Sequence, residues 1–480
     1  MPSQSLPPES EPFTAAIVGA GIAGLSAAIA LRRARFRVDV YERSKFANEI
    51  GAAISAPPNA TIVLREWGFD FAAAGVVPNL CTRYASGRDL EILSESRYED
   101  IEAVMGAPSF SFHRVDLHRG LRNLATEDKG DDPNVGVPVE IHLGCAVRSV
   151  DCENGIVTLV DGNEIQRDLV IIADGAHSSL LADFLGHPAP AQPTGRSIYR
   201  WLVSMEDVMA DPELALQYRN KLPGFLGWFD AAKHILWVNY ACRGETVLNN
   251  AVVHDTEHHA SQSQSDDDNS CELDNSVHHE QTQGERDISW HALASKETVL
   301  ATLSNFHPAA RRIVSMASED GIKVHQLLKR PPLESFVRGR TAVIGDAAHV
   351  MLPTHAAGCA VAIESAGVLE VLFKGSMGDD TVPENDSHQG REQLIRQRLR
   401  LFDKLRIPRC NLTMLVSNAG PEGLNIPGVE EEIRRFYQGP LPSEGARPWS
   451  DEFREVLFHY NAFHEATRAL SDERSGAEVG

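Results

Sequence analysis

Residues 14–42 constrain the fold of this chain more than any other stretch of its 480 residues. They begin with a short apolar run at 15–18, continue with Gly19-Ala20-Gly21-Ile22-Ala23-Gly24, and are then rich in Ala and Leu up to residue 34. A second, alternating run ends at Glu42. This order predicts a strand, a G-x-G-x-x-G turn, a crossover helix and a parallel strand, which together form a dinucleotide-binding βαβ unit.

Each glycine of this motif has a physical task. Gly19 permits the tight turn, Gly21 lets a pyrophosphate approach the backbone, and Gly24 lets the helix pack close to the strand. The helix then directs its N-terminal N–H groups at the phosphates. Glu42 stands where a carboxylate accepts hydrogen bonds from ribose hydroxyls and repels a 2′-phosphate, so FAD or NAD fits better than NADP. The alternative is a glycine turn that only caps a helix.

Composition excludes several classes of function. The formal net charge of −22 argues against binding to nucleic acid or to an anionic membrane. Seven cysteines without a C-x-x-C pair indicate free thiols in a reducing compartment, so we expect a cytoplasmic protein. The longest apolar stretch, 356–373, contains Glu364 and Glu370, which a membrane helix does not readily accept. The sequence therefore predicts a soluble protein without a membrane partner.

Two further motifs follow apolar runs in the middle and late parts of the chain. Residues 168–173 end in Asp174-Gly175, and residues 340–344 end in Gly345-Asp346. Acidic and glycine residues at the carboxyl end of a strand lie where ligands bind in α/β sheets. The alternative for Asp174-Gly175 is an ordinary turn. A long helix predicted at 356–373 directs its N-terminal partial positive charge back toward the end of the last strand.

The changes in patterning predict an α/β fold in which a Rossmann-like domain, with a parallel sheet and crossover helices, is interrupted by a second domain. Alternating, aromatic-rich runs between residues 196 and 253 predict an antiparallel sheet in this second domain. The acidic segment 254–287 lacks the apolar residues needed for a core and is predicted to be disordered. Its two His-His pairs offer no rigid ligand set, so we assign no metal site. The predicted parts are a disordered leader at 1–12; a dinucleotide-binding domain at 13–82, 110–190 and 335–375; a substrate domain at 83–109 and 191–334; a linker at 376–390; and a helical C-terminal segment at 391–480.

Taken together, these motifs resemble those of the single-component FAD-dependent aromatic hydroxylases, the group of salicylate hydroxylase and 4-hydroxybenzoate hydroxylase. The resemblance is carried by Gly19 to Gly24 with Glu42, by Asp174-Gly175, and by Gly345-Asp346 in a segment that ends in Leu352-Pro353. It is closest to fungal salicylate-hydroxylase-like enzymes, many of which act in secondary metabolism. It implies FAD as the cofactor, NADH or NADPH as a transient co-substrate, and O2 and a small aromatic molecule as substrates. It leaves a homodimer open.

The resemblance also implies roles for individual residues. Glu42 would bind the FAD ribose, Arg114 would lie along the cofactor, and Asp346 would hold the ribityl chain. The residues that would line or contact the flavin are Gly51, Ala53, Pro353, Gly358 and Cys359, while Asp174 and Gly175 would contact FAD and help the nicotinamide cofactor to bind.

Three features depart from the pattern of that family. Leu181 stands where an Arg is usual, which bears on the contact with NAD(P)H. Ala357-Gly358-Cys359 replaces Gln-Gly-Ala beside the flavin pyrimidine. The acidic insert is also longer than the usual loop.

Arg200 and Tyr240 are the predicted catalytic residues. They lie in separate strand-like runs of the second domain and would face the flavin if the two strands pair in one sheet. In the hydroxylases that the chain resembles, an Arg and a Tyr at similar places bind the phenolate or carboxylate of the substrate and orient its ring. A guanidinium favours the ionised phenol, whose ring is the better nucleophile. The alternative is an Arg on an exposed strand face and a Tyr in the core.

These observations predict an FAD-dependent monooxygenase that hydroxylates a phenolic or carboxylated aromatic ring through a flavin C4a-hydroperoxide. The resemblance implies this chemistry, for which the protein binds FAD, excludes water and fixes the ring. Two alternatives stay open: a flavin-fold module that acts through a binding partner without catalysis, and an oxidase or epoxidase of the same fold. A two-dinucleotide disulfide reductase would need a second glycine fingerprint in mid-chain, and the sequence has none.

Overall fold

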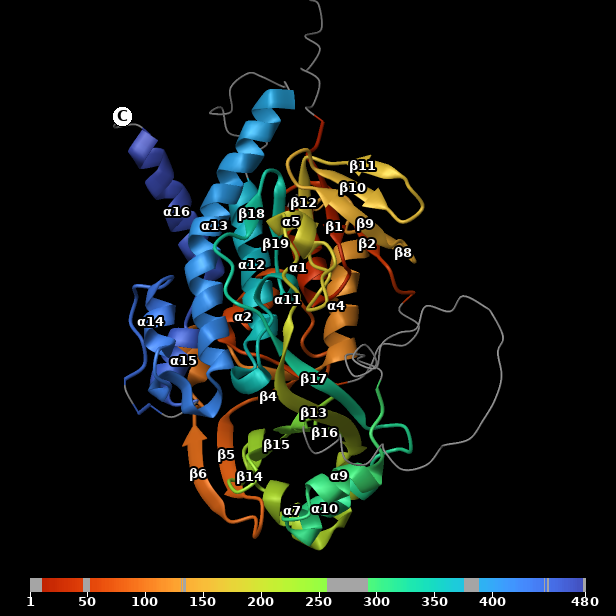
Figure 1. Cartoon of the computed structure of the whole chain (residues 1–480), viewed down its shortest axis with the longest axis vertical. Helices are drawn as coiled ribbons and strands as arrows, with labels where there is room; N and C mark the ends of the chain where they lie inside the picture. The colour runs from red at the N-terminus through yellow and green to blue at the C-terminus, as the bar shows by residue number, and fades with distance from the viewer. Residues whose placement is uncertain are drawn as a thin grey trace, which may run out of the picture.

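The computed structural model describes residues 11–45, 52–130, 132, 135–256, 292–374, 388–443, 445–446 and 449–477. Figure 1 shows two stacked bodies, each built on a sheet, with a third group of helices along one side. Several predictions fall outside the described residues: most of the leader, Gly51, most of the acidic insert and most of the linker at 376–390.

The upper body in Figure 1 contains a six-stranded sheet. In spatial order its strands are β18 (Val337–Arg338), β19 (Thr341–Val343), β12 (Leu169–Ile172), β1 (Thr14–Val18), β2 (Arg37–Glu42) and β8 (Glu140–Leu143). All neighbours pair in parallel except β18 with β19. The central strands β1 and β12 are apolar along almost their whole length because both of their faces are buried. The prediction of a Rossmann-like parallel sheet is confirmed.

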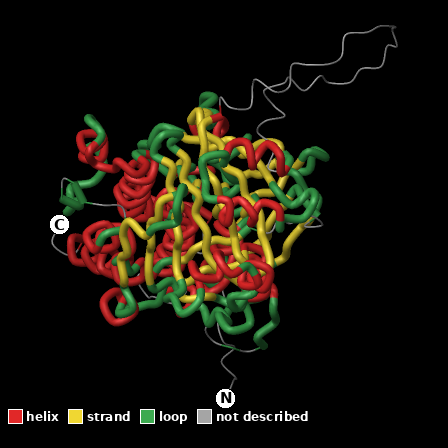
Figure 2. Tube along the Cα trace, turned by 90° about the horizontal axis from the view of Figure 1, so that it is seen from below, coloured by secondary structure: helices red, strands yellow, loops and turns green. Residues whose placement is uncertain are grey.

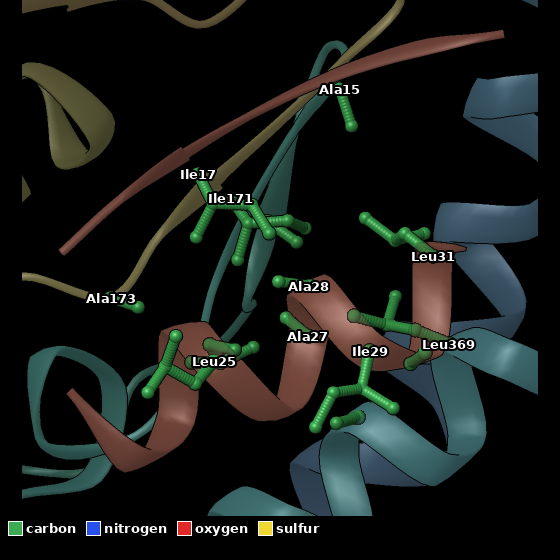
Figure 3. Packing of buried hydrophobic residues seen from close by; sticks show 14 of the residues in the cluster. Ala15, Ile17, Leu25, Ala27, Ala28, Ile29, Leu31, Ile171, Ala173 and Leu369 are labelled. Atoms are coloured by element: carbon green, nitrogen blue, oxygen red, sulfur yellow. The ribbon is translucent and has the colours of Figure 1, made fainter. Parts of the chain in front are cut away.

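Helix α1 (Ile22–Arg33) packs against this sheet through small residues. Figure 3 shows Ala28 of α1 facing Ile17 and Ile171 of strands β1 and β12. Ile29 lies beside Leu369 of helix α12 (Gly358–Phe373), so α1 is enclosed between the sheet and α12. Small side chains on α1 let both neighbours approach closely, which fixes the start of the helix relative to the end of β1.

Shorter elements complete this body. An antiparallel sheet of three strands contains β9 (Val147–Asp151), β10 (Ile156–Leu159) and β11 (Glu164–Gln166). A second antiparallel sheet contains β3 (Ala53–Ala56), β7 (Phe110–His113) and β4 (Val77–Pro78). The remaining elements here are α2 (Pro58–Glu66), α3 (Ile101–Met105), α4 (Arg114–Thr126), α5 (Leu181–Leu185), α11 (Asp346–His349) and the 3-10 helix η2 (Pro353–His355).

The lower body contains a seven-stranded sheet. Its spatial order is β17 (Lys323–Lys329), β13 (Gln192–Ser204), β16 (Val247–Asp255), β15 (Ile235–Cys242), β14 (Gly224–Asp230), β5 (Cys81–Ser86) and β6 (Ile92–Arg97). All neighbours are antiparallel except β14 with β5. The predicted antiparallel sheet is therefore a mixed one. Because β5 and β14 are far apart in the chain, no hairpin fixes their relative direction.

The two faces of this sheet have different neighbours. The outer face carries a buried aromatic core of Trp201, Trp228 and Trp237, covered by helices α7 (Pro212–Tyr218), α9 (Lys296–Thr302) and α10 (Pro308–Ser315), with α6 (Met205–Ala210) nearby. The inner face is directed toward the upper body. There Asn249 of β16 accepts a hydrogen bond from the backbone N–H of Ala53 on β3, at 3.1 Å.

Helices form the C-terminal part of the chain. They are α13 (His388–Asn418), α14 (Val429–Arg434), α15 (Asp451–Phe458) and α16 (Ala462–Ala477), with the 3-10 helix η3 (Gly420–Asn425) after α13. Figure 2 shows helices gathered on the side of the molecule where the C-terminus lies. A buried ion cluster joins α12 to α13, because Glu364 lies 2.8 Å from Arg406 and 2.7 Å from Arg409.

Two predicted boundaries were wrong. β16 extends to Asp255, so His254 and Asp255 belong to a strand and not to a disordered insert. His254 is fully buried and stacks on Tyr199, with ring centroids 4.2 Å apart, which holds this end of the strand. Helix α13 begins at His388, inside the predicted linker. Within the described ranges, no helix has both the length and the apolar character needed to span a bilayer.

The packing of α1 predicts the effect of Gly24→Ala. A Cβ at this position would lie 1.9 Å from the carbonyl oxygen of Gly19, so the helix must move away from the strand. We expect the free energy of unfolding to fall by about 1–3 kcal/mol, a typical cost of overpacking. Chemical denaturation followed by circular dichroism measures this change. Gly21→Ala is the control, because a Cβ there meets no described atom within 4 Å, and an equal loss in both variants would contradict the argument.

Candidate functional site

The glycine turn after β1 forms the first part of the site. Gly19 has a φ of +99°, and a Cβ on it would lie 2.4 Å from the carbonyl oxygen of Ala173, at the end of β12. Gly21 is the N-cap of α1, and no described side chain caps the N-terminal N–H groups of that helix. The open space beside Gly21 and the uncapped N–H groups fit a pyrophosphate.

Glu42 lies at the carboxyl end of β2, next to this turn. Its carboxylate accepts hydrogen bonds from the backbone N–H groups of Ala20 and Ser44, both at 2.8 Å. On the other side of the turn, Nε2 of His118 lies 2.7 Å from the carbonyl oxygen of Ala20. The half-buried carboxylate therefore sits beside the glycine turn, where a ribose-binding acid is expected. Its contact with ribose stays a prediction.

Asp174-Gly175 follows β12 at the same edge of the sheet. A Cβ on Gly19 would lie 3.2 Å from Cα of Asp174, so the first two motifs are in contact. Burial raises the pKa of Asp174, and hydrogen bonds that include one from Ser178 oppose this rise. Gly175 has a φ of +87°, a conformation that favours glycine.

Gly345-Asp346 brings the third motif to the same place. Gly345 has a φ of +64°, and a Cβ on it would lie 2.6 Å from Cβ of Ala23 in α1. The Asp346 side chain is accessible, yet burial raises its pKa, and His349 and Arg114 oppose this rise. The carboxylate is thus accessible at the end of β19, on the side where Arg114 lies, and is available to a ligand there.

Arg330 joins the loops that follow β12 and β19. Its buried guanidinium donates hydrogen bonds to the carbonyl oxygens of Ala176 at 3.3 Å and Ala347 at 2.9 Å. Its positive charge also interacts favourably with Asp174 and Asp346. The sequence analysis missed this residue. Its partners come from separate segments of the chain, so no local pattern marks it.

Arg114 and Ala53 lie where the two bodies meet. The backbone N–H of Arg114 donates a hydrogen bond to the carbonyl oxygen of Ala52 at 2.7 Å. Ala53 follows Ala52 and is the first residue of β3. Its backbone N–H donates a hydrogen bond to Asn249 across the boundary between the bodies. The predicted flavin-lining residue Ala53 is thus fixed against the inner face of the second sheet, and Asn249 is a further residue that the sequence analysis missed.

Gly358 and Cys359 begin α12 beside Asp346. A Cβ on Gly358 would lie 3.9 Å from Oδ1 of Asp346. Burial raises the pKa of the Cys359 thiol to about 12, Asp346 adds to the rise, and Arg114 opposes it. Four of the residues predicted to bind the cofactor therefore lie close together: Arg114, Asp346, Gly358 and Cys359. Pro353 is exposed at the start of η2, close to them in the chain.

Arg200 of β13 and Tyr240 of β15 lie on the inner face of the second sheet. Their strands belong to one sheet but do not pair directly, because β16 lies between them. The register still places both on one face: Arg200 is opposite Ala251, which is opposite Val238, two residues before Tyr240. Burial lowers the pKa of Arg200, Tyr240 opposes this, and Arg114 adds to it. Arg200 is half-buried, which contradicts the alternative of an exposed strand face.

His325 of β17 lies beside Arg200 on the inner face. The residue opposite it on β13 is Ile198, two positions before Arg200. Burial lowers the pKa of His325 to about 3, and the charge of Arg200 contributes. The imidazole is therefore neutral at physiological pH. The sequence analysis did not select it because a single His within a strand forms no motif.

The arrangement fits an FAD molecule extended along this edge of the first sheet. The glycine turn suits the pyrophosphate, Glu42 stands on the ribose side, and Asp346 with Arg114 stands on the side of the second body. The buried Nε of Arg200 has no hydrogen-bond partner among the described residues, which leaves a donor for a ligand on the inner face.

Comparison with known proteins identifies a matching family model, similar sequences and solved structures of the same fold. The model described as an NAD(P)-binding Rossmann-like domain matches residues 17–58. The FAD-dependent monooxygenase cfoG of Aspergillus candidus is 31% identical over 413 residues, covering 85% of this chain and 85% of that protein. Hispidin-3-hydroxylase of Neonothopanus nambi is 30% identical over 407 residues, covering 82% and 85%. A solved salicylate hydroxylase substrate complex has the same fold, with a TM-score of 0.66 and 21% identity over 95% of this chain and 98% of its own.

The open space at Gly21 predicts that Gly21→Val folds but is purified without FAD. No described atom lies within 4 Å of a Cβ at this position, so the packing of α1 stays intact. The branched side chain fills the space that the pyrophosphate needs. Flavin absorbance per mole of protein, together with circular dichroism, measures both effects. A stoichiometric flavoprotein from this variant would remove Gly21 from its assigned role.

The position of Asp346 predicts weaker cofactor binding in Asp346→Ala. Loss of a charge-assisted hydrogen bond costs roughly 1.5–3 kcal/mol, which lowers the affinity for FAD about ten- to a hundredfold. Titration of apo-protein with FAD, followed by flavin fluorescence, gives the dissociation constant. Asp346→Asn keeps the shape of the side chain but not its charge, so its affinity for FAD should fall less than that of Asp346→Ala. Unchanged affinity in Asp346→Ala would show that this carboxylate does not contact FAD.

Proposed function

This chain belongs to the single-component FAD-dependent monooxygenases, and from that premise we propose that it hydroxylates a phenolic or carboxylated aromatic ring bound by Arg200 and Tyr240. The position of Arg114 supports the proposal most directly. Its charge acts both on Asp346, in the cofactor cluster, and on Arg200, on the inner face of the second sheet. Asp346, which we assign to the cofactor, and Arg200, which we assign to the substrate, are therefore both near Arg114.

The reaction needs a cofactor, two electrons and oxygen. Bound FAD supplies the redox chemistry that transfers one oxygen atom of O2 to the ring. NADH or NADPH supplies the electrons, so a ring C–H, O2, NAD(P)H and a proton give a ring C–OH, NAD(P)+ and water. The protein contributes binding, orientation and exclusion of water.

Arg200 is suited to an anionic substrate. A guanidinium keeps its proton in proteins, so burial leaves Arg200 charged, and its unpartnered Nε adds a donor. Arg114 adds a second positive charge nearby. Together they favour a phenolate or carboxylate, and an ionised phenol has the more nucleophilic ring.

Tyr240 complements this charge. Burial raises the pKa of its hydroxyl, although Arg200 opposes the rise, so the group stays protonated at neutral pH and can donate a hydrogen bond. A donor fixed on the same face as Arg200 sets the direction of the bound ring. That orientation decides which ring carbon meets the flavin.

The relatives support an aromatic substrate and a metabolic setting. Hispidin-3-hydroxylase and salicylate hydroxylase are named for hydroxylation of such molecules, and cfoG comes from a filamentous fungus. We place the reaction in secondary metabolism on this basis. The six described cysteines are free thiols, which supports a reducing, cytoplasmic location.

The proposal predicts that Arg200→Ala separates cofactor reduction from hydroxylation. The variant should keep FAD and oxidise NAD(P)H, yet yield little hydroxylated product and release hydrogen peroxide, because no charge holds the ring in place. Product chromatography and a peroxide assay, each set against NAD(P)H consumption, measure the coupling.

Two further variants serve as controls. Arg200→Lys keeps the charge but loses the planar fork, so it should recover part of the coupling. Arg196 lies on the same strand, but its guanidinium lies 3.5 Å from the carboxylate of Asp255, away from Tyr240. Arg196→Ala should therefore couple NAD(P)H oxidation to hydroxylation as the wild type does. Full coupling in Arg200→Ala with the true substrate would overturn this assignment.

A further inference from the structure

The inner face of the second sheet carries aromatic rings beyond Tyr240. Phe225 of β14 lies beside Tyr240, with ring centroids 4.9 Å apart in an edge-to-face arrangement. Trp449, just before α15, also packs on Phe225, with centroids 5.0 Å apart. The three rings form a continuous row that leads from the candidate substrate anchor to the C-terminal segment.

A second contact seats the C-terminal segment over the same face. The guanidinium of Arg454 in α15 lies 4.4 Å from the ring centroid of Tyr98. The hydroxyl of Tyr98 lies 2.8 Å from Oγ1 of Thr82, and Thr82 is opposite Phe225 in the pairing of β5 with β14. The chain from Trp449 to Arg454 is therefore held against β5 and β14 at two places.

Trp449 also faces the flavin side of the site. His355, at the end of η2, stacks near Trp449 with centroids 6.5 Å apart and on Phe453 of α15 with centroids 5.3 Å apart. The His355 ring is fully buried, and neither of its nitrogens has a hydrogen-bond partner among the described residues. Because η2 begins at Pro353, Trp449 stands between the loop assigned to the flavin and the inner face of the sheet.

The backbone of Trp449 is unusual. Its φ of +67° lies in the left-handed region, which bulky residues rarely adopt. Such a conformation persists only where the surrounding structure fixes it, and it is concentrated at ligand sites. The neighbouring rings hold Trp449 in this position.

The dimensions of the inner face indicate the kind of substrate. Three strand spacings separate β13, which carries Arg200, from β14, which carries Phe225. At about 4.8 Å each, they amount to about 14 Å, more than a single aromatic ring spans. The charged end of this face is at Arg200, and its other end is lined by apolar rings.

We propose that Trp449 forms the apolar end wall of the substrate site and selects an elongated phenol. In this arrangement the phenolate lies at Arg200 and Tyr240, and a flat conjugated extension packs on Phe225 and Trp449. Stacking on aromatic side chains favours such an extension over a flexible or polar one. The inference rests on the proposed function, because it assumes that the ring is anchored at Arg200.

Two probes test the proposal, the single-ring 4-hydroxybenzoate and the two-ring 3,4′,5-trihydroxystilbene. Dissociation constants come from the change in flavin absorbance on binding, and kcat/KM and coupling come from product analysis. Trp449→Ala should weaken binding of the stilbene about tenfold and leave binding of 4-hydroxybenzoate within about twofold. Trp449→Phe keeps a ring and should restore most of the preference. Phe225→Leu should by itself lower the preference for the stilbene over 4-hydroxybenzoate.

The control separates substrate selection from stability. Leu457 of α15 is buried in the same C-terminal cluster but is not part of the row of rings. Leu457→Ala should lower the melting temperature and leave the ratio of the two dissociation constants unchanged. An unchanged ratio in both Trp449→Ala and Phe225→Leu would overturn the role of Trp449 while the hydroxylase proposal stands. Absence of product from the wild type with phenols that bind would instead overturn the proposed reaction, and the ratio would still decide the role of Trp449.

Discussion

Close approach of neighbouring segments, at glycines where no side chain fits, is the constraint on which the rest of this structure depends. At Gly24 a Cβ would collide with the carbonyl oxygen of Gly19, and at Gly345 it would collide with Ala23 of the same helix. These absent side chains let α1 touch both β1 and the loop after β19. The glycine turn and the carboxylate of Asp346 are thereby placed near one end of α1, although more than three hundred residues separate them in the sequence.

Electrostatics then link the residues proposed for the cofactor to those proposed for the substrate. Arg114 interacts with Asp346 on one side and with Arg200 on the other. In a partly desolvated site such charges act more strongly than in water. Arg330 also interacts favourably with Asp174 and Asp346, the carboxylates of two separate motifs. Under the proposed function, the charges of Arg114 and Arg200 would favour an anionic ring beside the flavin.

The C-terminal helices are joined to the dinucleotide fold through α12. Burial works to raise the pKa of Glu364 in α12, but Arg409 and Arg406 of α13 outweigh it and keep the carboxylate ionised. An ion cluster of this kind contributes less to stability than to a fixed orientation, here that of the helix whose first turn holds Cys359. The same C-terminal segment supplies Trp449, which packs on Phe225 of the second sheet.

The sequence by itself determined the glycine turn, the acid after β2, the Asp346 motif and the presence of a second, strand-rich domain. Local backbone chemistry dictates each of these, and local chemistry can be read from neighbouring residues. Only the tertiary structure decided that β16 separates Arg200 from Tyr240, and that Asn249, Arg330 and Trp449 lie near the residues assigned to the site. Strand order and contacts between distant segments depend on the packing of whole faces and not on any short pattern. For that reason the sequence could propose residues for the cofactor but not the end wall that we propose for the substrate site.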